Sequence, residues 1–146
     1  MELRSPGFEH GGQIPSRHTC DGADASPALE IGGVPEGTAA LALVMDDPDA
    51  PGGTFDHWLV WNIPPQTAGI PEGTEPEGVQ GRTGFGKMGY GGPCPPGGTH
   101  RYRFKLYALD RRLDLKAGAR KGQLEQAMKG HILAETLLQG TYTRQR

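Results

Sequence analysis

The sequence predicts a mostly β protein, and three observations support this fold class. Apolar and polar residues alternate in three stretches, residues 38–46, 57–63 and 101–109, as they do in strands whose two faces differ in burial. The chain contains 24 glycines and 13 prolines, about a quarter of its 146 residues, and they separate these stretches with turns. Helical periodicity is nearly absent before the last thirty residues. We therefore expect many short strands in a single domain spanning residues 1–146.

The elements are expected in the following order along the chain. Residues 1–37 contain several turn clusters and are expected to form short strands within irregular structure. Strands follow at residues 38–46 and 57–63. Residues 64–99 are rich in glycine, proline and acidic side chains, and a segment this long predicts a functional loop that also forms some strand. Residues 101–109 form the last expected strand.

A different period begins at Lys121. Apolar residues recur there at helical spacing on both sides of Gly130; they are Leu124, Ala127, Met128, Ile132, Leu133 and Leu137. Glycine lowers the stability of a helix interior. We therefore expect two short peripheral helices near the C-terminus, joined at Gly130.

The alternation also predicts where polar side chains meet. The odd-numbered face of the first long strand is apolar and ends in Asp47, and the odd-numbered face of the second begins with His57. If these strands are antiparallel neighbours, both side chains lie at the same end of the sheet. The apolar face of the third strand begins with His100 and Tyr102. The sequence thus predicts a polar pocket, lined by these four residues, at the rim of the core.

Charge and composition exclude several classes of protein. The net charge is −2 and the basic residues are scattered, which disfavours nucleic-acid binding. No apolar run is long enough to span a bilayer, and the first residues lack the apolar region of a signal peptide. We therefore expect a cytoplasmic protein without integral membrane contact. A reducing compartment would leave Cys20 and Cys94 as thiols, although one disulfide is also possible.

Residues 81–89 contain two weak nucleotide-binding patterns. Residues 84–89 match G-x-G-x-x-G, and residues 81–87 match a P-loop up to its final Ser/Thr, which is Met88 here. Both motifs need a preceding strand and a following helix, whereas prolines follow at 93, 95 and 96. A nucleotide site is therefore disfavoured, but the backbone N–H groups of such a loop can still bind an anion.

Two blocks of sequence identify a family resemblance. Residues 46–51 are followed by His57-Trp58, and residues 89–96 are followed by residues 100–102. Shorter matching segments are residues 11–15, 19–22, 26–27, 33–38, 62–64, 130–131 and 140–142. On these motifs the chain resembles the phosphatidylethanolamine-binding proteins, in particular their bacterial branch, often called Raf kinase inhibitor-like proteins. It departs from the bacterial pattern at Ile31, where a tryptophan is common.

The resemblance implies a β-sandwich of antiparallel sheets with a few peripheral helices and a small pocket for phosphate-like groups. By motif position, the pocket's side chains would be Asp47, His57, His100 and Tyr102, with the backbone of Gly91, Gly92 and Pro93 as a wall. The prolines in the surrounding loops predict a preformed pocket and at least one cis X-Pro bond. The bacterial relatives also suggest a homodimer, and so do two tryptophans, Trp58 and Trp61, expected on opposite faces of one strand.

These observations predict a ligand-binding protein without catalysis, cofactor or metal, whose ligand is a phosphate-bearing or other anionic small molecule. Imidazoles that can gain a proton favour an anion. Two alternatives stay open. Asp47, His57 and His100 form a two-histidine, one-carboxylate set that a metal-dependent or acid–base enzyme would use, together with Tyr102. Alternatively, the surface would inhibit a protease or kinase.

Overall fold

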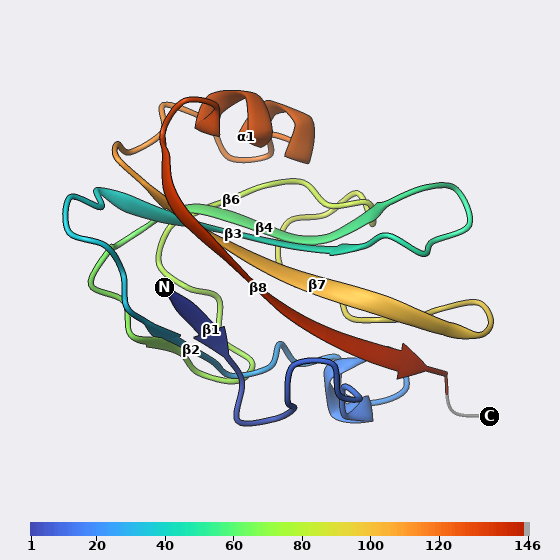
Figure 1. The fold of residues 1–146 in the computed structure, drawn as a ribbon. Coiled ribbons are helices and arrows are strands. Elements are labelled where there is room, and N and C mark those ends of the chain that lie inside the picture. Colours follow the sequence, from blue (N-terminus) through green and yellow to red (C-terminus); the bar gives the residue numbers. More distant parts are fainter. Residues whose placement is uncertain (145–146) are drawn as a thin grey trace.

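The computed structural model describes residues 1–144, which form two antiparallel sheets packed face to face (Figure 1). The larger sheet has the strand order β6-β4-β3-β7-β8, with bounds Val79–Gln80, Phe55–Ile63, Ala40–Asp47, Thr99–Leu109 and Ile132–Thr143. The smaller sheet has the order β1-β2-β5, with bounds Glu2–Arg4, Leu29–Gly32 and Gly69–Ile70. The predicted fold class, a mostly β antiparallel sandwich, is confirmed.

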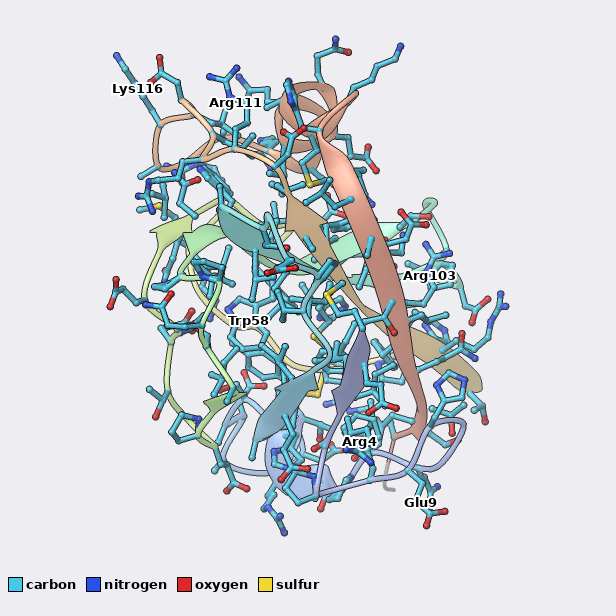
Figure 2. The ribbon with its side chains drawn as sticks, turned by 60° about the vertical axis from the view of Figure 1, so that its left-hand side comes forward. Arg4, Glu9, Trp58, Arg103, Arg111 and Lys116 are labelled. Carbon is cyan, nitrogen blue, oxygen red and sulfur yellow. A yellow bond between two sulfur atoms is a disulfide. The ribbon has the colours of Figure 1, made fainter. Side chains whose placement is uncertain are left out.

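The main core fills the space between the two sheets. Alternate residues of β3 and β7 point into it, as predicted; they are Leu41, Leu43, Met45, Tyr102, Phe104, Leu106 and Ala108. Trp58 lies in the interior of the molecule, as Figure 2 shows. Side chains from β1 and β2 close the core from the other side. This burial of apolar surface provides the main force that holds the sheets together.

A second core lies on the outer face of the larger sheet. The helix α1, Lys121–Met128, covers this face in Figure 1. Leu124 and Met128 of the helix pack in one cluster with Trp61, whose indole N–H donates to the carbonyl of Leu115 at 3.0 Å. Trp58 and Trp61 are therefore both fully buried within one chain. The argument for a dimer from an uncovered tryptophan is wrong, and the homodimer stays a prediction from the resemblance.

The second predicted C-terminal helix is wrong, because residues 132–143 form strand β8. This strand pairs with β7 along almost its whole length, from Ile132 opposite Leu109 to Thr143 opposite Thr99. The apolar residues Ile132, Leu133 and Leu137, which suggested a helix, are exposed. Pairing with an 11-residue neighbour outweighed the local pattern. The helices of the described residues are α1 and a short 3₁₀ turn, η1, at Ser16–His18.

Cys20 and Cys94 form a disulfide, which is the second of the two possibilities that the sequence left open. The bond joins the segment after η1 to the loop before β7, across a sequence separation of 74 residues. Within residues 1–144, no helix has the length and apolar character needed to cross a membrane.

Candidate ligand-binding site

A cavity of about 190 Å³ lies at the end of the larger sheet, where β3 ends and β7 begins. All four side chains that the sequence placed in a pocket line it, from three different strands. The complete lining is Asp47, Ala50, Pro51, Phe55, His57, Phe85, Cys94, Pro95, Pro96, His100 and Tyr102. The structure therefore brings the predicted side chains together at the rim of the main core.

His57 reaches the cavity because of a β-bulge in β4. Met45 pairs with Trp58, but the next residue of β3 pairs with Asp56, so His57 is an extra residue in its strand. Strict alternation predicted that His57 shares a face with Leu59 and Trp61, and this is wrong, since those two residues pack in the outer core. The bulge turns His57 to the inner side, where its ring centroid lies 5.3 Å from that of Tyr102.

A backbone carbonyl outside the cavity lining holds the imidazole of His57 in one orientation. Its Nδ1–H donates to the carbonyl oxygen of Gly91 at 2.7 Å, because a carbonyl can only accept. Burial lowers the pKa of His57, and this outweighs the opposing effects of the Gly91 carbonyl and the Asp47 carboxylate. The ring is therefore neutral at pH 7, and its Nε2 carries a lone pair.

His100 is oriented by Asp47. Its Nδ1–H donates to Oδ2 of Asp47 at 2.7 Å, and both side chains are almost completely buried. Oδ1 of Asp47 accepts the backbone N–H of Asp49 at 2.8 Å, which fixes the carboxylate at the start of the loop. A carboxylate that holds one ring nitrogen sets the direction of the other. This contact leaves Nε2 as the nitrogen of His100 that can meet a ligand.

Tyr102 contributes a buried hydroxyl to the cavity. The residue is fully buried, and its hydroxyl makes no hydrogen bond of ordinary geometry within the described part of the chain. Burial raises the pKa of Tyr102 far above its usual range, and the nearby Asp47 carboxylate adds to the rise. The phenol is therefore a neutral donor that lies beside the Asp47 carboxylate and lines the cavity.

The predicted backbone wall of Gly91, Gly92 and Pro93 is not among the residues that line the cavity. These residues support the cavity from outside its lining. Gly91 holds His57, and the N–H of Gly92 donates to Oδ1 of Asp24 at 2.9 Å. A Cβ on Gly92 would lie 2.3 Å from the carbonyl oxygen of His18, which explains the glycine. The wall itself consists of Cys94, Pro95 and Pro96. The described residues contain no cis peptide bond, so that prediction is wrong.

The apolar mouth of the cavity was not predicted. The side chain of Phe85 is 44% exposed. Its ring contacts the rings of Phe55 and His57 edge-on, with distances between ring centroids of 4.8 Å and 5.3 Å. Phe85 belongs to the glycine-rich segment that resembled a nucleotide motif. Here that segment forms a tight turn closed by a bridge between Arg82 and Met88, with no helix after it. In the sequence, the one feature that could have indicated the role of Phe85 was its position as an aromatic residue between two glycines.

No three His, Cys, Asp or Glu side chains among residues 1–144 are grouped as metal ligands would be. In the cavity, the Nδ1 atoms of His57 and His100 are both engaged by protein oxygens. Both Nε2 atoms stay available, and metal-binding histidines usually have their other ring nitrogen engaged in this way, so the metal-dependent alternative stays a prediction.

The comparison with known families agrees with the fold. A sequence model of the phosphatidylethanolamine-binding proteins matches residues 4–143. The chain belongs to this family. Among curated relatives of this family member, a UPF0098 protein of Methanothermobacter thermautotrophicus is 50% identical over 150 residues, with 99% of each chain covered. A UPF0098 protein of Chlamydia trachomatis is 41% identical, also with 99% of each chain covered.

Two solved structures share the fold of this phosphatidylethanolamine-binding protein family member. A phosphatidylethanolamine-binding protein homologue from Chlamydia trachomatis superimposes with a TM-score of 0.95 at 40% identity, covering 98% of this chain and 97% of its own. YbcL of Escherichia coli, described as a member of the mammalian family, superimposes with a TM-score of 0.91 at 32% identity. The coverage there is 99% of this chain and 98% of YbcL.

Proposed function

We propose that this family member binds a small phosphate-bearing or otherwise anionic molecule, and that it does so without catalysis. The ligand would occupy the cavity at the end of the larger sheet, where β3 ends and β7 begins. One observation carries the proposal. Three polar side chains converge on the cavity. Nε2 of His57 and Nε2 of His100 have no hydrogen bond to the described residues, and the hydroxyl of Tyr102, beside the Asp47 carboxylate, is a third donor. Each of these atoms can donate to an oxyanion when it carries a proton.

The size and lining of the cavity favour a headgroup-sized ligand. Its volume of about 190 Å³ is below the range of roughly 300–1,000 Å³ found for pockets that hold drug-sized molecules. Phe55, Phe85 and Pro51 make part of the lining apolar, which suits the carbon portion of a phosphate ester. The Asp47 carboxylate opposes an anion, but it accepts a hydrogen bond from the Nδ1–H of His100 and would also suit an ammonium group on a zwitterionic ligand.

Binding of an anion is expected to be coupled to proton uptake. Neutral His57 presents a lone pair to the cavity, which repels an oxyanion, whereas the imidazolium would donate a hydrogen bond. An anion therefore favours the protonated ring, and by linkage protonation favours the anion. Affinity should increase as the pH falls through the imidazole range.

Titration calorimetry with inorganic phosphate tests the proposal, at about pH 6 and pH 8 where histidine changes charge. His57→Ala and His100→Ala should each weaken binding about 10- to 100-fold, the worth of a charge-assisted hydrogen bond. His131→Ala is the matched control, because His131 bonds to Asp110 at the far end of β7 and should leave the affinity unchanged. Sulfate, which keeps its charge over this range, separates titration of the protein from that of phosphate.

Equal phosphate affinity in the wild type, His57→Ala and His100→Ala would contradict the proposal. Hydrolysis of a phosphate ester, or a bound transition metal that is lost with either variant, would support the enzyme alternative. A protein partner that still binds when both histidines are replaced would support the interaction alternative. Location in the cytoplasm and a homodimeric state belong to the proposal, and light scattering at high protein concentration tests the second.

A further inference from the structure

The disulfide is part of the wall of the cavity. Cys94 lines the cavity together with Pro95 and Pro96, and we call these three residues the wall segment. Its partner, Cys20, belongs to the segment that follows η1. The bond therefore connects the cavity to a part of the chain that does not itself line it.

Hydrogen bonds between the same two parts of the chain end just before the wall segment. The hydroxyl of Tyr90 donates to the carbonyl of His18 at 2.6 Å, and the N–H of Cys20 donates to the carbonyl of Pro93 at 3.1 Å. With the bond from Gly92 to Asp24, these contacts hold the chain as far as Pro93. Pro95 and Pro96 have no N–H group and cannot add a backbone donor. The disulfide is therefore a covalent attachment of the wall segment, in addition to its other contacts.

The two sulfur-bearing residues differ in access to solvent. Cys20 is exposed, whereas Cys94 is half-buried against the cavity. A thiolate can attack Sγ of Cys20 from solvent without entering the cavity. Exposed disulfides are the ones that tend to be labile or regulatory.

We propose that Cys20 and Cys94 form a reversible thiol–disulfide site that controls the ligand cavity. The bond in the oxidised form holds the wall segment in place, and reduction releases it and weakens ligand binding. The inference rests on the proposed function, because it concerns the same cavity.

The reductant would be a dithiol. One of its thiolates attacks Sγ of Cys20, and the electron pair of the disulfide passes to Sγ of Cys94, which takes up a proton. The second thiol of the reductant then displaces Cys20 from the mixed disulfide, and the reductant leaves as its own disulfide. The protein gains two electrons and two protons in total.

The test compares phosphate binding by oxidised and dithiothreitol-reduced protein, with thiols counted by mass spectrometry. If the wall is in place only about one-tenth of the time after reduction, the phosphate dissociation constant increases about tenfold. The variant carrying both Cys20→Ser and Cys94→Ser should bind as weakly as reduced wild type, with or without dithiothreitol. This variant is also the control for effects of the reductant itself.

Amide hydrogen exchange gives a second readout that does not depend on phosphate. Exchange at Cys20 and at residues 97–98 should become faster on reduction, while β3 and β7 keep their protection. Unchanged affinity and unchanged exchange in reduced protein would overturn the inference and leave the proposed function standing. Global unfolding on reduction would also overturn it, because the bond would then hold the fold. Faster local exchange in a protein that never binds phosphate would instead reject the proposed function.

Discussion

Asp46 and Asp47 are neighbours at the end of β3, and they lie on opposite faces of the same sheet with different partners. Both carboxylates are buried. On the outer face, Asp46 accepts hydrogen bonds from Arg103 at 2.7 Å, Lys105 at 3.1 Å and Lys121 at 3.2 Å. On the inner face, Asp47 accepts one from the imidazole of His100. Figure 2 shows Arg103 beside β8, the strand with which it pairs.

The difference separates a structural acid from one that can serve a ligand. Burial by itself would raise the pKa of Asp46, but the hydrogen bond from Arg103 and the charges of Lys105 and Lys121 outweigh it, and the pKa is lowered. The partners of Asp46 are a guanidinium and two ammonium groups directed at carboxylates on the outer face. The partner of Asp47 is an imidazole that has a second nitrogen for a ligand in the cavity. A buried carboxylate can thus serve a ligand through a partner that has a second functional atom.

The largest expected effect follows from Asp46→Asn. The change leaves three cations near a neutral amide, and removing one partner of a buried ion pair costs roughly 3 kcal/mol of the free energy of unfolding. Urea denaturation measures this loss, and phosphate affinity of the folded protein should not change. Asp49→Asn is the control, because Asp49 pairs with Arg101 on the surface and should cost under about 1 kcal/mol. A similar small cost for both variants would contradict the structural role of Asp46.

A smaller effect is expected in the pH dependence of stability. Burial lowers the pKa of His57, so below about pH 6.5 the unfolded chain binds a proton that the folded chain does not. The contribution of His57 is therefore complete above that pH and is lost as the pH falls, with a slope of at most about 1.4 kcal/mol per pH unit. His57→Gln should flatten the curve measured by urea denaturation between about pH 5 and pH 7. An identical slope in the variant would mean that His57 is not shielded from solvent.

The smallest effect is expected from Asp47→Asn, the inner counterpart of the first variant. The amide keeps the shape and can still accept from His100, but the negative charge near the bound anion is gone. Inorganic phosphate should bind equally well or severalfold more tightly, whereas phosphoethanolamine, which carries an ammonium group, should bind more weakly. Calorimetry with both compounds measures the contrast. Equal weakening of both would show that Asp47 acts only by orienting His100.

The sequence predicted the inner faces of β3 and β7 correctly because alternation is a property of the backbone of any regular strand. Asp47, His100 and Tyr102 followed from that rule and from antiparallel pairing, and the family motifs agreed with them. His57 reached the predicted cavity by a different route. Its bulge depends on how β4 pairs with β3, and no local pattern in the sequence indicates where such an extra residue lies.

By itself, then, the sequence determined the fold class, the antiparallel strands around the core and the place of Asp47, His100 and Tyr102 at its rim, since each depends on local periodicity or on a short motif. Tertiary structure alone decided three things: that residues 132–143 pair as β8, that α1 and its flanking loop bury Trp61, and that Cys20 meets Cys94. Each of these depends on contacts between segments far apart in the chain. Their free energy is gained only when the partner segment is in place, so no window of the sequence contains it.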